Sequence, residues 1–207
     1  MKILEPSKLN FTSTILDQKI KSIYLAAPHQ GAGSTTCAYS LARALSRLIS
    51  EKVILIDGNP GPGSLTEQLR LKDSLGFSDL ILSGGRGTIT KAIHNVEGEG
   101  FHVISTGQQE VQAPIAGERP SLNQLIESLT DTYSYVIYDG PPIHKSNEPL
   151  ALAAAFDGVV LVLETNETRW EVANSAKEKL IQAGANVIGA IFNKRRYYVP
   201  QWVYDLL

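Results

Sequence analysis

The sequence predicts an α/β fold in which a mainly parallel sheet carries helices on both faces. The first observation is that apolar runs alternate with helical patterns along most of the chain. The second is that these runs are continuously apolar, as is typical of strands buried on both faces. The third is a glycine-bearing turn between the first apolar run and the first helical pattern. Together they favour a doubly wound, three-layer architecture of the P-loop type.

The expected helices lie between the expected strands, with two helices between the second strand and the third. The expected strands are the apolar, often β-branched runs Ser22–Ala27, Val53–Ile56, Phe101–Ser105, Tyr135–Tyr138, Val159–Leu163 and Val187–Phe192. The expected helices are Thr35–Ser50, Ser74–Leu82, Thr88–His94, Ser121–Asp131, Leu150–Ala155 and Thr168–Ala183. Ser121 with Gln124, and Thr168 with Glu171, have the spacing of a capping box, which predicts a helix start at each pair.

The length of 207 residues suits one globular domain with short appended ends. We expect a lead-in over residues 1–20, the ATPase-like domain over 21–195 and a tyrosine-containing tail over 196–207. The glycine- and proline-rich stretches Gly58–Ser64 and Gly107–Pro120 are expected to be long loops, and such loops commonly border a site in this kind of fold.

Composition excludes several classes of function. The net charge of −2 provides no overall basic field, so the sequence does not predict a nucleic-acid partner. A single cysteine, Cys37, excludes an internal disulfide and a multi-thiolate metal site, and its position predicts a buried apolar residue. No signal peptide or membrane-spanning run is visible, so we expect a cytoplasmic chain without direct membrane insertion.

The turn at residues 28–36 has the local architecture of a P-loop. It places Gly31 and Gly33 between a strand and a helix N-terminus, where unblocked backbone N–H groups and the helix dipole favour a phosphate. The P-loop pattern continues glycine, lysine, then serine or threonine, but here Gly33 is followed by Ser34 and Thr35. The lysine that would reach the β- and γ-phosphates is therefore missing.

Two carboxylates are expected at the same edge of the sheet as this turn. Asp57 follows the second apolar run and Asp139 follows the fourth, and parallel strands present their carboxyl ends at one edge. P-loop proteins hold Mg²⁺ or its waters with such carboxylates and with the hydroxyl of the loop, here Thr35. The sequence therefore predicts a magnesium site made of Thr35, Asp57 and Asp139.

The segments APHQGAGSTT, VILIDGNP, GFSDLI, FHVISTG, YVIYDGPP and DGVVLVLETN resemble the bacterial tyrosine kinases (BY-kinases) of capsule and exopolysaccharide assembly, which are deviant Walker P-loop ATPases. The resemblance implies ATP or ADP with Mg²⁺ as cofactors, Asp57 and Asp139 as the Walker A′ and Walker B aspartates, and Asn193 beside the adenine. It also implies that Glu148 stands where the family has another aspartate. The resemblance implies a Walker A loop made of Gln30, Gly31, Ala32, Gly33, Ser34, Thr35 and Thr36.

The chain departs from this family in the residues that handle the nucleotide. Ser34 replaces the loop lysine, and Asn59 stands where the family has a second aspartate. A cation about 4 Å from a phosphate oxygen contributes roughly 4 kcal/mol at an intermediate dielectric, before desolvation. Lys194, Arg195 and Arg196 are the basic residues whose charge could substitute. We therefore expect weak nucleotide binding at most, and weak or no kinase activity.

Three hypotheses for the function remain open from the sequence. The first is a BY-kinase-like protein that acts by binding a membrane-embedded polysaccharide chain-length regulator, alone or as a homo-oligomer, and so lies at the inner membrane. The second is an active autokinase that phosphorylates Tyr197, Tyr198 or Tyr204 in the tail, although the sequence favours packing of these aromatic residues on the sheet edge. The third is a partition-type ATPase that dimerises on nucleotide.

Overall fold

The computed structural model describes residues 20–48, 51–83, 89–108, 119–144 and 147–195. Its strands are β1 (Ser22–Ala26), β2 (Val53–Asp57), β3 (Ile93–Asn95), β4 (His102–Ile104), β5 (Tyr135–Asp139), β6 (Gly158–Glu164) and β7 (Val187–Asn193). Its helices are α2 (Ser34–Leu48), α3 (Leu65–Gln68), α4 (Phe77–Leu82), α5 (Ile89–Ala92), α6 (Arg119–Thr132), α7 (Glu148–Ala153) and α8 (Trp170–Gln182). None of the described helices is long and apolar enough to cross a bilayer.

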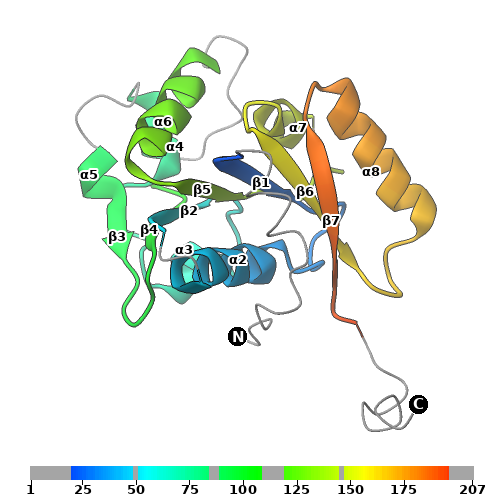
Figure 1. Ribbon diagram of the computed structural model, residues 1–207, viewed down its shortest axis with the longest axis horizontal. Helices are drawn as coiled ribbons and strands as arrows, with labels where there is room; N and C mark the ends of the chain where they lie inside the picture. Colours follow the sequence, from blue (N-terminus) through cyan, green and yellow to red (C-terminus); the bar gives the residue numbers. More distant parts are fainter. Residues whose placement is uncertain (1–19, 49–50, 84–88, 109–118, 145–146, 196–207) are drawn as a thin grey trace, which may run out of the picture.

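The seven strands form one sheet in the order β3-β4-β2-β5-β1-β6-β7. All neighbouring strands are parallel except β3, which runs antiparallel to β4. Helices α2 and α3 cover one face, and α4, α6, α7 and α8 cover the other (Figure 1). This arrangement confirms the three-layer, mainly parallel fold expected from the sequence.

The alternation of side chains along the central strands sorts them between two cores. Odd-numbered residues of β1, β2 and β5 pack under α2, whereas even-numbered residues pack under α4, α6 and α7. All five residues of each of these strands are buried, which explains their continuously apolar sequences. Asp57 and Asp139, as odd-numbered residues, consequently project to the face that α2 covers.

Several expected elements differ from the observed ones. The helix expected over Thr88–His94 ends at Ala92, because Ile93–Asn95 pairs with β4 as an unpredicted edge strand. The helix expected from Ser74 begins at Phe77, where the backbone N–H of Gly76 and the Asp79 carboxylate form the cap. The short helix α3 was not predicted, because its four residues carry too little periodicity.

Both predicted capping boxes are wrong. Helix α6 begins at Arg119, two residues before Ser121, so Ser121 lies inside the first turn and does not cap it. Helix α8 has Arg169 at its N-cap position without a side-chain cap. The Thr168 hydroxyl instead accepts a hydrogen bond from the backbone N–H of Glu164, at 3.0 Å, which closes the turn between β6 and α8.

Candidate functional site

The loop between β1 and α2 has the backbone shape of a P-loop. Gly31 and Gly33 have φ angles of +88° and +92°, in the left-handed region where glycine is favoured. A side chain at Gly31 would meet no atom within 4 Å, so the space beside this part of the loop is open. Helix α2 starts at Ser34, and its first backbone N–H groups therefore point toward the loop.

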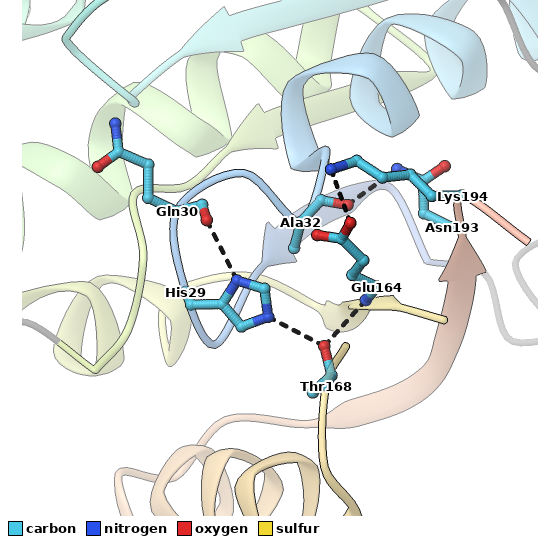
Figure 2. A network of polar contacts seen from close by, with 7 residues as sticks. All are labelled: His29, Gln30, Ala32, Glu164, Thr168, Asn193 and Lys194. Atoms are coloured by element: carbon cyan, nitrogen blue, oxygen red, sulfur yellow. Dashed lines mark hydrogen bonds and ion pairs between the residues drawn. The ribbon is translucent and has the colours of Figure 1, made fainter. Parts of the chain in front are cut away.

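The end of β7 holds this loop in place. The Asn193 side-chain amide donates to the carbonyl of Ala32 at 2.8 Å, and both residues are buried (Figure 2). A Cβ atom at Gly33 would lie 2.1 Å from Asn193 Nδ2, so glycine is required here for close approach as well as for its φ angle. Asn193, predicted to border the nucleotide, thus also acts as a tether between the two ends of the domain.

His29 turns away from the loop and joins a network at the β6–α8 turn (Figure 2). Its Nδ1 contacts the carbonyl oxygen of Gln30 at 3.1 Å, and its Nε2 lies 3.0 Å from the Thr168 hydroxyl. Because a carbonyl can only accept, Nδ1 carries a proton in this arrangement. The Gln30 side chain is exposed and points away from this network, so the side chains of His29 and Gln30 leave the loop open.

Asp139 and Thr35 form the centre of the site. The Thr35 hydroxyl donates to Asp139 Oδ2 at 2.5 Å, which links the first turn of α2 to the end of β5. The other carboxylate oxygen, Oδ1, is buried and has no hydrogen-bond partner within the described part of the chain. A buried carboxylate oxygen without a donor is costly, and it is the type of ligand that Mg²⁺ prefers.

Asp57 lies beside Asp139 in register on the neighbouring strand, but its oxygens are occupied. Its Oδ2 accepts from both the backbone N–H and the hydroxyl of Thr66, each at 2.7 Å. Its Oδ1 accepts from the backbone N–H of Asn59 at 3.2 Å. The Thr66 hydroxyl in turn accepts from the Thr106 N–H, so Asp57 ties together the loops that follow β2 and β4.

The electrostatics of the two carboxylates follow from these contacts. Burial raises the pKa of Asp139 to about 7; the Thr35 hydrogen bond opposes this rise, and the nearby Asp57 charge adds to it. Burial also raises the pKa of Asp57, but the hydrogen bonds from Thr66 and Asn59 oppose the rise. A divalent cation at Asp139 would favour its charged form and offset the cost of burial.

The donor set therefore fits a divalent cation but lacks the charge for a polyphosphate. The structure brings Thr35 and Asp139 together and places Asp57 in register on the neighbouring strand, and the magnesium site of these three residues stays a prediction. Ser34 is buried and its side chain is neutral, so it supplies no positive charge. No group of three or more His, Cys, Asp or Glu side chains that could hold a metal ion occurs in the described ranges.

The other predicted site residues lie in the first turns of two helices, at the rim of the loop, or outside the described part of the chain. Thr36 is half-buried in the first turn of α2, and Glu148 is the exposed first residue of α7. Lys194 pairs with Glu164 at 3.0 Å at the rim of the loop, whereas Arg196 and the tail tyrosines Tyr197, Tyr198 and Tyr204 lie outside the described residues. Of the basic residues considered as substitutes for the loop lysine, Lys194 is thus engaged with Glu164.

Sequence reasoning missed the partners of Asp57 and His29. Thr66 lies in the short helix α3 and Thr168 in the turn before α8, and nothing in the local sequence indicated that they would contact Asp57 and His29. A pocket of about 340 Å³ lies beside Thr66. The loops that border it were predicted to flank a site, and its lining is Pro60, Gly61, Pro62, Ser64, Thr66, Glu67, Lys72, Thr106 and Gly107.

Comparison with known proteins identifies the family of this fold. A family model described as an AAA domain matches residues 20–183. The tyrosine-protein kinase CpsD of Streptococcus pneumoniae is 24% identical over 177 residues, which cover 85% of this chain and 77% of CpsD. The kinase domain of the Escherichia coli tyrosine kinase ETK superposes with a TM-score of 0.76 at 22% identity, covering 91% of this chain and 73% of that structure.

A structure solved with ADP and magnesium shares the fold as well. Cobyrinic acid a,c-diamide synthase from Mycobacterium smegmatis superposes with a TM-score of 0.70 at 19% identity, covering 90% of this chain and 81% of that one. The fold is thus one on which a magnesium nucleotide is bound in another protein. This chain belongs to the AAA-domain family, and the resemblance to bacterial tyrosine kinases expected from its motifs is confirmed.

Proposed function

We propose that this protein is a BY-kinase-like component of capsule or exopolysaccharide biosynthesis with weak or no ATP-dependent kinase activity. It would act by binding a membrane-embedded polysaccharide chain-length regulator, and would lie at the inner membrane through that partner. The observation that carries the proposal is Ser34, a buried neutral residue at the position of the loop lysine.

The chemistry of phosphoryl transfer explains why replacement of the loop lysine by Ser34 is expected to weaken kinase activity. Transfer depends almost entirely on positioning and on neutralising charge at the phosphates. The described loop supplies backbone N–H groups and a cation site at Thr35 and Asp139, but no lysine. Magnesium with ADP or ATP would supply charge neutralisation when bound, and we expect that binding to be weak.

The ion pair of Lys194 and Glu164 supports the same reading. Lys194 is the basic residue nearest in sequence to the Asn193 tether, yet its ammonium group is 3.0 Å from Glu164 Oε1. Glu164 is mostly buried, with 18% of its side chain exposed, so withdrawal of Lys194 would leave a poorly solvated carboxylate. Lys194 is therefore a poor substitute for the missing lysine.

Restoring the lysine tests the nucleotide half of the proposal. We would titrate MgADP into the wild-type chain, Ser34→Lys and the uncharged length control Ser34→Met by calorimetry. Wild type and Ser34→Met are expected to bind with dissociation constants above about 100 μM, and Ser34→Lys at least ~10-fold more tightly, because one close charge is worth a few kcal/mol. Tight magnesium-dependent binding by wild type, or phosphotyrosine on the purified wild-type chain, would contradict the proposal.

The partner half needs a separate measurement. Peptides from the cytoplasmic ends of a membrane-embedded polysaccharide chain-length regulator would be immobilised, and binding of the wild-type chain measured with and without MgADP. Binding that does not require nucleotide is the expected result. Absence of binding under both conditions would remove the partner from the proposal, whereas dimerisation on nucleotide by light scattering would favour a partition-type ATPase.

A further inference from the structure

The outer edge of the domain at β7 and α8 carries an unusual amount of exposed apolar surface. Trp170 is 76% exposed and Phe192 is 70% exposed, and Ile181 is also half exposed. Ala190, two residues before Phe192, is exposed as well. We call these four residues the β7–α8 surface. Two aromatic side chains at this level of exposure are a typical mark of an interaction site.

The register of the sheet shows that Ala190 and Phe192 share the face that α8 covers. Ala190 pairs with Leu161 and Phe192 pairs with Leu163 in the parallel β6–β7 ladder. Paired residues project to the same side, and both leucines belong to the core beneath α8. Phe192 therefore lies on the α8 side of β7, but outside the packed core.

Helix α8 presents Trp170 and Ile181 toward the open side of the same edge. The two residues are eleven positions apart, about three helical turns, so they lie on one stripe of the helix. The buried residues of α8, Ala173, Ala176 and Leu180, lie roughly a quarter turn around the helix from this stripe. Trp170 and Ile181 therefore flank the face of α8 that packs on the sheet.

Strand β7 is also an open edge of the sheet. It pairs with β6 alone, and in Figure 1 it is the outermost strand beside α8. An open edge with exposed aromatic side chains is a liability that proteins usually cover. The part of this chain that the structure describes does not cover it.

We infer that residues 196–207 of the same chain dock on the β7–α8 surface. The described chain leaves β7 at Asn193 and turns at Lys194, whose φ angle is +57° and whose side chain is held by Glu164. Twelve residues span up to about 40 Å, whereas the Trp170–Ile181 stripe is only about 16 Å long. The segment is rich in apolar residues, namely Tyr197, Tyr198, Val199, Trp202, Val203, Tyr204, Leu206 and Leu207.

Docking within one chain is favoured over docking between copies because the segment is tethered next to its site. A short linker gives an effective local concentration in the millimolar range. Docking also withdraws the tail tyrosines from solvent, so it restricts their access to any kinase. The inference does not depend on nucleotide binding, and it stands or falls separately from the proposed function.

The two tryptophans of the chain, Trp170 on the surface and Trp202 in the segment, make the inference testable by fluorescence. In Trp202→Phe the only tryptophan is Trp170, and acrylamide quenching of selectively excited tryptophan fluorescence would be compared with the same variant lacking residues 196–207. Removal of the segment is expected to raise the quenching constant at least ~2-fold and to shift the emission to longer wavelength. Equal quenching with and without the segment would overturn the inference.

A second arm reads the segment itself. In Trp170→Phe, which keeps an aromatic ring on the surface, Trp202 is the only tryptophan and is excited selectively. Adding Phe192→Ala is expected to raise its quenching constant, whereas the matched control Leu82→Ala, another exposed apolar residue on α4, leaves it unchanged. Equal effects of the two substitutions, or shielding that grows with protein concentration between about 1 and 100 μM, would overturn docking within one chain.

Discussion

The ends of β2 and β5 carry the same dipeptide, aspartate then glycine, in the same register, yet their aspartates have opposite surroundings. Asp57 accepts three hydrogen bonds from Thr66 and Asn59, whereas Asp139 accepts from Thr35 and keeps one buried oxygen without a partner among the described groups. The strands deliver equivalent carboxylates, and the loops beyond them decide their roles. Asp57 anchors the loop after β2, and we propose that Asp139 remains available for a cation.

The largest expected effect is a pH dependence centred on Asp139. Its folded pKa of about 7 lies above the ordinary value of 3.8, so the folded state binds the proton more strongly than the unfolded state. Stability is then highest below about pH 4 and falls as the pH rises to about 7, by up to about 4 kcal/mol from this group. Asp139→Asn should remove most of this fall, as measured by urea unfolding between pH 4 and 8.

Magnesium provides the control for the Asp139 prediction. At pH 8, millimolar Mg²⁺ is expected to stabilise the wild-type chain, because the ion favours the charged carboxylate, and to have little effect on Asp139→Asn. If wild type and variant show parallel pH profiles with and without Mg²⁺, the assignment of Asp139 as the incompletely satisfied carboxylate is wrong.

The next effect distinguishes Asp57 as a structural anchor. Asp57→Asn places an amide donor against the two donors of Thr66, so at least one buried hydrogen bond is lost and one group is left unpaired. We expect a loss of about 2–4 kcal/mol of unfolding free energy at pH 7. Thr66→Val, which removes the hydroxyl but keeps the backbone N–H, should cost about half as much. A loss below about 1 kcal/mol for Asp57→Asn would remove the contrast with Asp139.

The glycines after the two aspartates are predicted to be required for packing. A Cβ at Gly58 would lie 2.0 Å from the Tyr138 hydroxyl, and a Cβ at Gly140 would lie 2.3 Å from Cζ of Tyr24. Each tyrosine ring is buried and cannot withdraw, so Gly58→Ala and Gly140→Ala should each cost about 2–3 kcal/mol in thermal or urea unfolding. Gly189→Ala, where a Cβ meets no atom within 4 Å, is the matched control and should be close to neutral.

The sequence was sufficient for the fold and for the chain positions of the candidate site. Continuous apolar runs fix buried parallel strands, and Asp57 and Asp139 follow two of them, so their proximity could be predicted from topology alone. The edge strand β3 was missed because three residues that pair on one side carry no periodic signal. The capping boxes failed because tertiary partners, such as His29 for Thr168, compete for the same hydroxyl.

What the sequence could not predict is which donors reach each carboxylate. Thr66 follows Asp57 by nine residues through a loop rich in glycine and proline, and Thr35 reaches Asp139 across 104 residues of chain. These contacts are set by loop conformation, and the residue types alone do not specify them. The roles of the individual site residues in nucleotide and metal binding therefore stay predictions, which the variants of Ser34, Asp57 and Asp139 test.

The smallest expected effect concerns the tyrosine beneath Gly140. Tyr24 is fully buried, stacks on Tyr138 with ring centroids 5.1 Å apart, and its hydroxyl has no hydrogen-bond partner among the described residues. Burial, with the nearby Asp139 charge, raises the pKa of this phenol, so the hydroxyl stays neutral. Tyr24→Phe removes an unsatisfied polar group but leaves a small void, and the two effects nearly cancel.

We therefore expect Tyr24→Phe to change the unfolding free energy by at most about 1 kcal/mol, with a gain favoured, which corresponds to about 2–4 °C in Tm. In the double variant with Gly140→Ala, Tyr24→Phe should recover only part of the unfolding free energy that Gly140→Ala loses. The ring carbons at the Cζ and Cε1 positions of residue 24 would still lie within about 2.4 Å of the new methyl group. A loss larger than 1 kcal/mol for Tyr24→Phe alone would mean that the hydroxyl is hydrogen-bonded in solution. The Tyr24 hydroxyl at the β5 end would then be satisfied, as both carboxylate oxygens of Asp57 are at the β2 end.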